Sequence, residues 1–391
     1  MEKVRYGIIG VGNMGSSHAK KFLSGAVENG VLTAICDLKP AKMEKVLALE
    51  FEGASSLATF TDYKEMLASG LVDAVIVAVP HYFHPPITIE ALNAGLHVIC
   101  EKPAGVYTKQ VKEMNAVAEK SDTLFTMMFN QRTNCLYRKM HEMIQNGELG
   151  EIKRVNWIIT DWYRSQSYYD SGDWRATWRG EGGGVLFNQC PHQLDLLQWV
   201  TGMMPARVHT FCHFGKWHDI EVEDDVTAYL EYENGATGVF VTTTADAPGT
   251  NRFEITGNNG KLVCDGKTLV FHKLDTPERE FNATYKGGFG HPKAEIIEVE
   301  TDGQNPQHVG ILNNFSNAIL GLEPLFVQGT EGLRGVELMD AMLLSTWLGQ
   351  TVSLPIDDEL YLAELNKRIA TGRRKDGVDV VLDTDGTYGS K

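Results

Sequence analysis

Residues 4–15 read VRYGIIGVGNMG, a short apolar run that leads directly into a Gly-x-Gly-x-x-Gly motif. A buried strand, a glycine turn and a following helix are together typical of the first unit of a dinucleotide-binding fold. In such a turn Gly10 permits the sharp bend, Gly12 lets the backbone approach a pyrophosphate, and Gly15 allows close packing of helix on strand. The N–H groups of the helix N-terminus attract the phosphate anion. We therefore predict cofactor contacts at Gly10, Gly12, Asn13, Met14 and Gly15.

An acidic residue beyond the turn discriminates between the two nicotinamide cofactors. Asp37 ends the second strand pattern, 22 residues after Gly15. A carboxylate at that place accepts a hydrogen bond from the ribose 2′-hydroxyl and repels a 2′-phosphate. Lys39 stands close by and is the one feature that would suit NADP. The pattern favours NAD over NADP.

The first third of the chain alternates regularly between strand and helix patterns. Strand patterns occupy residues 4–9, 31–36, 72–79, 97–100 and 123–129, and helical patterns occupy 14–24, 40–49, 62–68, 85–94 and 108–120. Such alternation predicts βαβ units and a doubly wound parallel sheet. We expect a Rossmann domain over residues 1–129, and therefore the α/β class.

The remaining residues, 130–391, predict a second domain of the α+β type. Alternating strand patterns cover residues 150–160, 207–214, 225–232, 236–244, 252–256 and 261–264, with Gly-Asn turns between several of them. They indicate a large, mostly antiparallel sheet with one open face, closed by helices over 309–320 and 332–348. Residues 274–309 are interpreted as a long loop, and residues 371–391 as a tail without structure.

Composition narrows the class of protein. The 391 residues include 36 Lys and Arg against 51 Asp and Glu, a net charge of −15, which disfavours nucleic acid and anionic membranes as partners. It also favours an uncharged or cationic substrate over a phosphorylated one, unless Arg164, Arg175 and Arg179 gather locally. No apolar run is long enough for a spanning helix. The six scattered cysteines indicate reduced thiols, and we expect a cytoplasmic protein.

Two further motifs complete a recognisable set. Residues 94–103 read AGLHVICEKP and residues 182–195 read GGGVLFNQCPHQLD, while Val79-Pro80 ends a strand with His84 just beyond. With the glycine turn, they resemble the Gfo/Idh/MocA oxidoreductases, which include glucose–fructose oxidoreductase and inositol dehydrogenases. The resemblance runs from residue 4 to about residue 355. It implies an NAD-dependent dehydrogenase that holds a sugar or polyol against the nicotinamide and transfers a hydride between a CH–OH carbon and nicotinamide C4.

The resemblance also implies site residues. Lys102 and His192 match the family's catalytic lysine and histidine, whereas Asn188 stands where the family usually has Asp. Because Asn can orient a hydroxyl but cannot carry a proton, the acid–base role passes to His192 and Lys102. Asn188 and His192 would share one helix face at a spacing of four, and Asp195 would either orient the imidazole or make a structural hydrogen bond. Ligands bind at the carboxyl ends of parallel strands, so cofactor contacts are also expected at Val79, Pro80, His84, Glu101 and Lys102.

Substrate contacts are expected from an aromatic-rich segment and from the end of the last Rossmann strand. Aromatic faces and arginine forks suit sugar rings and hydroxyls, although the same aromatics would also serve as core or oligomer contacts. The candidates are Asn130, Arg132, Tyr163, Arg164, Trp174 and Arg175, beside Lys102, Asn188 and His192. The loop 287–292, GGFGHP, could reach over an active site, its own or a neighbour's.

A metal site is not expected. His209, Cys212, His213 and His218 are close in sequence, but on a strand His209 and His213 would share one face and Cys212 the other.

Three functions remain open at this level. The first is a simple dehydrogenase of a sugar, glycoside or cyclic polyol. The second keeps the same site but recycles NAD in place, so that the net reaction is glycoside cleavage or epimerisation. The third is a non-catalytic NAD-sensing regulator, against which intact Lys102 and His192 argue. An open apolar sheet face predicts a homodimer or homotetramer.

Overall fold

The computed structural model describes residues 3–373 and 375. The chain forms two compact units that are interleaved in sequence. The first combines residues up to 145 with 191–202 and 300–338, and the second combines 146–190, 203–299 and residues from 339 onward. The single boundary predicted near residue 129 stays a prediction. Most of the predicted tail lies outside the described residues.

The sheet of the first unit has six parallel strands in the order β3-β2-β1-β4-β5-β6. The strands are β1 Val4–Ile9, β2 Gly30–Cys36, β3 Ala58–Phe60, β4 Ala74–Val77, β5 His97–Cys100 and β6 Phe125–Met127. This arrangement confirms the doubly wound fold, with the glycine turn at the carboxyl end of its central strand. No sequence pattern predicts β3, because three half-exposed residues at a sheet edge carry no periodic signal.

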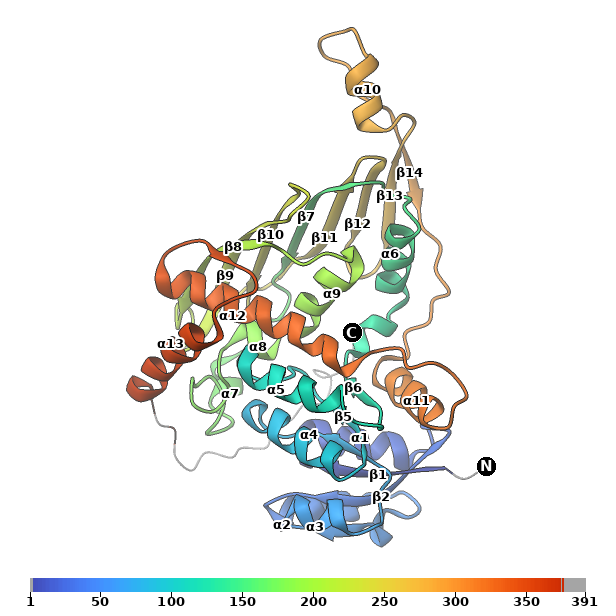
Figure 1. Cartoon of the computed structure of the whole chain (residues 1–391), viewed down its shortest axis with the longest axis vertical. Helices are drawn as coiled ribbons and strands as arrows, with labels where there is room; N and C mark the ends of the chain where they lie inside the picture. The colour runs from blue at the N-terminus through green and yellow to red at the C-terminus, as the bar shows by residue number, and fades with distance from the viewer. Residues whose placement is uncertain (1–2, 374, 376–391) are drawn as a thin grey trace. The chain divides into compact units, whose positions relative to one another are not determined.

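Helices flank this sheet, and several come from distant parts of the chain (Figure 1). The Rossmann helices are α1 Asn13–Leu23, α2 Pro40–Leu47, α3 Tyr63–Ala68, α4 His84–Asn93 and α5 Thr108–Ala118. Asp62 caps α3, accepting the N–H of Lys64. The unit also contains α6 Cys135–Gln145, α9 Pro191–Thr201, α11 Gln307–Ile319 and the first turns of α12 Gly332–Leu348. Helix α11 contacts β1 through a 2.8 Å hydrogen bond between the hydroxyls of Tyr6 and Ser316.

The second unit is built on a nine-stranded mixed sheet in the order β14-β13-β12-β11-β7-β10-β9-β8-β15. Its strands are β7 Ile152–Ile159, β8 Arg207–Phe214, β9 Glu223–Glu231, β10 Thr237–Thr243, β11 Asn251–Gly257, β12 Gly260–Cys264, β13 Leu269–Leu274, β14 Ala294–Glu298 and β15 Val352–Ser353. Among the described strands of this sheet, only β7 and β10 pair in parallel. The helices of this unit are α7 Gln166–Tyr169, α8 Val185–Asn188, α10 Glu278–Thr284, α13 Asp358–Thr371 and the C-terminal part of α12.

The two faces of this sheet differ in burial, as the alternating strand patterns predict. On one face Trp157 of β7 stacks on Phe253 of β11 at 4.1 Å between ring centroids. On the other face Phe211 is 61% exposed, and Tyr229 and Ile158 are also exposed.

The prediction of a long loop over residues 274–309 was wrong. The segment contains α10 and β14, and Figure 1 shows α10 at the tip of an excursion beyond the sheet edge. Since α10 buries no residue, its sequence lacks the amphipathic pattern by which a packed helix is recognised. Within the described part of the chain, no helix is both long and apolar enough to cross a membrane.

Candidate active site

The turn between β1 and α1 has the geometry that a pyrophosphate site requires. Gly10 has φ +88°, in the left-handed region where glycine is favoured. A Cβ at Gly15 would stand 1.9 Å from the carbonyl oxygen of Gly10, so only glycine allows this close approach. A Cβ at Gly12 would meet nothing within 4 Å, which leaves open space at the turn. No side chain caps α1, so its first N–H groups, from Asn13 and Met14, suit the pyrophosphate of NAD.

Asp37 lies at the end of β2 and is tied to the glycine turn. Its carboxylate accepts the backbone N–H of Val11 at 3.0 Å and that of Lys39 at 2.9 Å. A carboxylate oxygen accepts more than one hydrogen bond, so the group keeps the capacity to accept a ribose hydroxyl. The position fits NAD, and the ribose contact itself stays a prediction.

His84 links the ends of two neighbouring strands. Its Nε2 lies 2.8 Å from the carbonyl oxygen of Val79, which follows β4, and its Nδ1 lies 2.7 Å from that of Pro103, which follows β5. The ring is buried, and burial lowers the pKa of His84. The clamp positions the turn that carries Lys102. A direct contact of His84, Val79 or Pro80 with the cofactor stays a prediction.

Beneath that turn lies a buried hydrogen-bonded pair that sequence reasoning missed. Oε1 of Glu101 lies 2.6 Å from Nε2 of His18, whose ring is fully buried in α1. The other carboxylate oxygen accepts the backbone N–H of Lys102 at 3.2 Å. Burial alone would raise the pKa of Glu101, but the hydrogen bond from His18 and nearby positive charges, including Lys102, lower it to about 2. Glu101 therefore acts as a fixed anion beside Lys102.

Lys102 and His192 belong to the same unit and lie within range of each other's charge. His192, on α9, is buried, and its Nδ1 has no hydrogen-bond partner among the described residues. Burial first, and then the charges of Lys102 and His308, lower the pKa of His192 well below its usual value. The imidazole is therefore neutral at physiological pH, the state in which it accepts a proton.

His308 is a second group that the sequence gave no reason to select, because it comes from a distant part of the chain. It stands near the start of α11, with its ring centroid 5.5 Å from that of His18. Burial lowers the pKa of His308 to about 4. The preceding Gln307 has φ +52°, a strained conformation for a residue with a side chain, and its Oε1 accepts Nδ2 of Asn130 at 2.5 Å. Asn130 is thus buried at this junction, and its own Oδ1 has no hydrogen-bond partner in the described part of the chain.

Arg132 is committed to an internal ion-pair network. Its Nε and Nη2 donate to Asp195 at 2.8 and 2.6 Å, and its Nη1 donates to Glu331 at 2.7 Å. Asp195 also accepts from Gln198 at 3.1 Å. Of the two roles considered for Asp195, the structural hydrogen bond is the one observed. A substrate contact by Arg132 stays a prediction.

Asn188 and His192 do not share a helix. Helix α8 ends at Asn188, and α9 begins only at Pro191, so the spacing of four does not place both on one face. Asn188 belongs to the second unit, where its Oδ1 accepts the Tyr168 hydroxyl at 3.0 Å and its Nδ2 donates to the buried Glu181. Its amide therefore has a defined orientation.

A second buried acid, Glu223, holds the helix that carries Asn188. Its Oε1 accepts the backbone N–H groups of Gly184 and Leu186 at 2.8 and 3.0 Å. Burial raises the pKa of Glu223 to about 8. Neither Glu181 nor Glu223 belongs to a sequence pattern that sets it apart from surface glutamates.

The aromatic-rich segment of the second unit brings together three of the four predicted substrate residues. Arg164 and Arg175 both lie over the ring of Tyr168, and Arg175 also lies over Trp174. Tyr163 is 54% exposed.

The cysteine and histidines of β8 are not grouped on one face. Cys212 is buried while His213 is exposed on the other face of β8, and no three His, Cys, Asp or Glu side chains in residues 3–373 could hold a metal ion.

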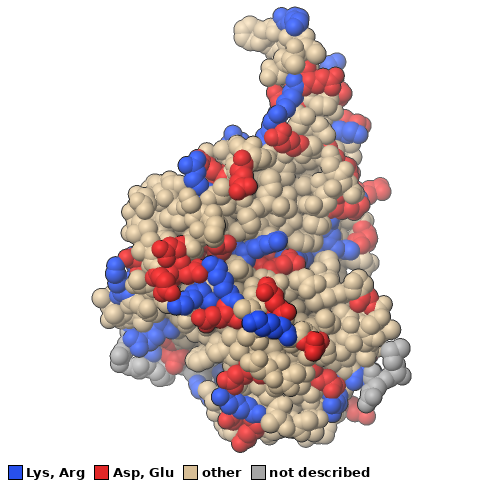
Figure 2. All heavy atoms as spheres, in the orientation of Figure 1, with Lys and Arg blue, Asp and Glu red and all other residues tan. Residues whose placement is uncertain are grey.

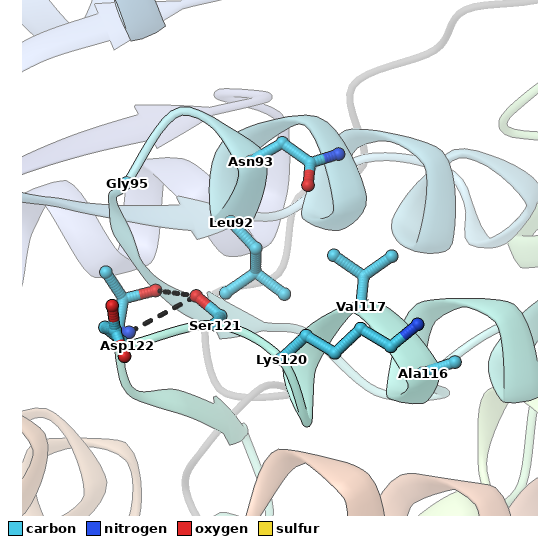
Figure 3. A pocket seen from close by; sticks show the side chains of 9 residues that line it. Leu92, Asn93, Gly95, Ala116, Val117, Lys120, Ser121 and Asp122 are labelled. Carbon is cyan, nitrogen blue, oxygen red and sulfur yellow. Dashed lines mark hydrogen bonds between the residues drawn. The ribbon is translucent and has the colours of Figure 1, made fainter.

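A pocket between the C-terminal ends of α4 and α5 is lined by Leu92, Val117 and Ser121 (Figure 3). It lies at the amino ends of β5 and β6, opposite the edge where a doubly wound sheet binds its ligand. Acidic and basic side chains are interspersed on the face in Figure 2, which shows no continuous basic stripe.

Comparison with known proteins identifies the family. Residues 4–129 match the model of the oxidoreductase family with an NAD-binding Rossmann fold, and residues 137–263 match the GFO/IDH/MocA C-terminal domain. The chain belongs to the Gfo/Idh/MocA family. Its first domain is therefore an NAD-binding Rossmann domain, as the glycine turn and Asp37 predicted.

Individual relatives of this Gfo/Idh/MocA protein are dehydrogenases of sugars and polyols. D-glucoside 3-dehydrogenase of Escherichia coli is 30% identical over 250 residues, 59% of this chain and 68% of that protein. Inositol 2-dehydrogenase of Corynebacterium glutamicum is 24% identical over 242 residues, 60% of this chain and 65% of that protein, so the match spans slightly under two thirds of its length. The WlbA dehydrogenase of Chromobacterium violaceum, solved with NADH and UDP-GlcNAcA, is 27% identical with a TM-score of 0.77, covering 91% of this chain and 97% of that one.

Proposed function

We propose that this protein is an NAD-dependent oxidoreductase that transfers a hydride between a secondary alcohol of a sugar, glycoside or cyclic polyol and C4 of the nicotinamide. The observation that carries the proposal is the grouping, in one unit, of the glycine turn with Lys102 and the neutral His192. Bound NAD would supply the hydride acceptor, and these side chains would manage the proton.

His192 is proposed as the base that takes the hydroxyl proton as the hydride leaves. Its low pKa disfavours the protonated state, so a proton that it accepts is readily passed on.

Lys102 is proposed to stabilise the negative charge that develops on the substrate oxygen, much as an oxyanion site does. The fixed anion of Glu101 behind it and the His84 clamp hold the Lys102 turn. Asn188 cannot carry a proton, and it is proposed to orient a substrate hydroxyl through its amide.

The names of the relatives support the substrate class. Inositol 2-dehydrogenases and D-glucoside 3-dehydrogenase act on CH–OH groups of rings, and the WlbA dehydrogenase was solved with a nucleotide sugar.

The alternative with internally recycled NAD is kept because of one further relative. A glycosyl hydrolase family 109 protein of Shewanella is 26% identical over 195 residues, 42% of that protein's length. Oxidation of a ring carbon acidifies the neighbouring C–H, and elimination or epimerisation can then follow at the same site.

One experiment separates the candidate functions. The purified protein is incubated with NAD and a panel of inositols, free sugars and glycosides, while NADH absorbance and product mass are followed together. NADH accumulation supports the simple dehydrogenase, and a changed product without NADH supports the internal cycle. NAD binding with neither outcome supports the sensing regulator and refutes both enzyme functions.

We also propose a homodimer or homotetramer formed through the open sheet face. The exposed Phe211 and Tyr229 belong to the neighbouring strands β8 and β9, and Ile158 belongs to β7, one strand further on beyond β10. A second copy would bury them. Sedimentation of the wild type against Phe211→Asp tests this, because a monomeric wild type would contradict it.

A further inference from the structure

Two guanidinium groups converge on the ring of Tyr168. The guanidinium carbon of Arg164 lies 5.1 Å from the ring centroid, and that of Arg175 lies 4.5 Å from it. Arg164 also lies 5.7 Å from the ring of Trp162, and Arg175 lies 4.6 Å from that of Trp174. Aromatic faces hold cations in this way. Two like charges are nevertheless gathered around one phenol, and they repel each other.

Neither arginine has a carboxylate partner among the described residues. Other arginines of the same unit do form ion pairs: Arg207 with Glu231, Arg252 with Glu254, Arg279 with Glu151 and Arg368 with Glu364. The chain has 51 acidic residues against 36 basic ones, so carboxylates are not scarce. Two half-buried guanidinium groups left without acids therefore point to an anion supplied from outside.

The arginine pair is held in place by a chain of hydrogen bonds. Nη1 of Arg175 donates to the Tyr168 hydroxyl at 2.8 Å, and that hydroxyl donates to Asn188. The next residue, Ala176, has φ +53°, and its N–H donates to buried Glu181 at 2.6 Å. A left-handed alanine persists only when its surroundings impose it. The position of Arg175 is thus fixed before any ligand arrives.

A buried donor lies beside Arg164. Nε1 of Trp162 is buried and has no hydrogen-bond partner in the part of the chain that the structure describes. A buried N–H is usually satisfied in native structures, by protein or by a bound molecule. Trp162 stacks with Arg164, so this donor belongs to the same cluster.

We propose that Arg164 and Arg175, gathered around Tyr168, bind an anionic substituent, a carboxylate or a phosphate, on the sugar or polyol substrate. The inference rests on the proposed function and narrows it to acidic substrates. The net charge alone favoured an uncharged or cationic substrate. That expectation holds only if Arg164, Arg175 and Arg179 do not gather locally. Arg164 and Arg175 do gather, around Tyr168, so the expectation of an uncharged or cationic substrate fails. Guanidinium groups bind carboxylate and phosphate oxygens through paired, charge-assisted hydrogen bonds.

The test measures binding and turnover separately. Calorimetry on the NADH-loaded protein gives affinities for D-glucose, D-glucuronate and D-glucose 6-phosphate, and NAD reduction is followed with methyl glucoside and methyl glucuronide. We expect at least one anionic ligand to bind about tenfold or more tightly than glucose. Whichever of glucuronate and glucose 6-phosphate binds more tightly identifies the anion. Raising the salt concentration should weaken the anionic ligand only.

The variants are Arg164→Gln and Arg175→Gln, with Arg179→Gln as the matched control. Arg179 belongs to the same segment but is exposed, and its contact is with a backbone carbonyl. Each of the first two substitutions should weaken anion binding about tenfold, a larger loss than the same substitution causes in glucose binding. Arg175→Lys keeps the charge but loses the fork, so it should recover only part of the affinity. The control should change neither.

The outcomes distinguish this proposal from the proposed function. The anion site is overturned if glucose binds as tightly as both anions. It is also overturned if anion binding is unchanged in Arg164→Gln and Arg175→Gln. Either result holds against the site even if neutral sugars are oxidised. Arginine-dependent anion binding supports the site even if no ligand is oxidised, in which case it is the dehydrogenase function that fails.

Discussion

Gly12→Ala should separate cofactor binding from folding. Gly12 has φ −67° and ψ −158°, an extended conformation that alanine adopts, and a Cβ there meets nothing within 4 Å. Within the protein itself the added methyl group therefore fits without strain. The free energy of unfolding should change by no more than about 0.5 kcal/mol.

The effect on NAD is expected to be large. The open space beside Gly12 is where the backbone must approach the pyrophosphate, and a methyl group would occupy it. Losing one charge-assisted hydrogen bond from the turn costs about 1.5–3 kcal/mol. At 1.4 kcal/mol for each factor of ten, the Kd for NADH should rise by about 10- to 100-fold.

Fluorescence titration with NADH and thermal unfolding without cofactor measure the two effects. Gly15→Ala is the matched control, because its Cβ would stand 1.9 Å from the carbonyl oxygen of Gly10 and the turn itself must move. We expect Gly15→Ala to lower both stability and affinity. If Gly12→Ala binds NADH as tightly as the wild type does, the pyrophosphate does not lie beside Gly12. If Gly12→Ala is much less stable than the wild type, the conclusion that a methyl group fits there without strain is wrong.

The remaining predictions concern catalysis, cofactor choice and the buried ion pairs. Lys102→Ala and His192→Ala should each abolish turnover while NADH still binds, and near-normal rates would remove that residue from the mechanism. Because the pKa of His192 is depressed, kcat/KM should fall on the acid side only below pH 6.5. Lys102→Met removes a cation that lowers this pKa, so the fall in whatever activity remains should move to higher pH. Asp37→Ala should weaken NAD and relax discrimination against NADP, as measured by the ratio of the two affinities, and an unchanged ratio would contradict the ribose contact. Arg132→Met leaves Asp195 buried without its cation and should destabilise the protein by about 3–5 kcal/mol in denaturant unfolding. Burial already raises the pKa of Asp195, so this deficit should shrink as the pH falls and the carboxyl is protonated; a deficit independent of pH would argue against the charge as its cause.

Short-range patterns predicted the Rossmann half almost strand by strand. The strand over 4–9, the glycine turn and the helix started by Pro40 are recognised from neighbours in sequence, since their signals are apolar spacing and turn residues. Prediction failed where a helix buries almost no side chains, because such a helix lacks an apolar face in its sequence. The exposed helix α10 is the example. It also failed at Asn188 and His192, which a spacing of four placed on one helix, although the chain breaks between α8 and α9.

The candidate site was predicted in its chemistry but not in its surroundings. The motifs selected Lys102, His192 and the dinucleotide turn, because these residues stand at fixed offsets from a strand end or a glycine cluster. His18 and His308 were missed, since a lone histidine on a helix has no distinguishing pattern. The role of His18 arises from its hydrogen bond to Glu101. His308 lies beside the His18 ring, although it comes from a segment about two hundred residues beyond Glu101 in the chain.

The sequence by itself determined the fold class, the cofactor and the family, because each depends on local spacing that survives without knowledge of long-range contacts. Only the tertiary structure decided what the charged groups do. It paired Arg132 with Asp195 and buried Glu101 against His18. It also gathered Arg164 and Arg175 around Tyr168, with no carboxylate partner for either among the described residues. The physical reason is that a charge acquires its role from its neighbours in space and from its burial, and residues far apart in the chain supply both.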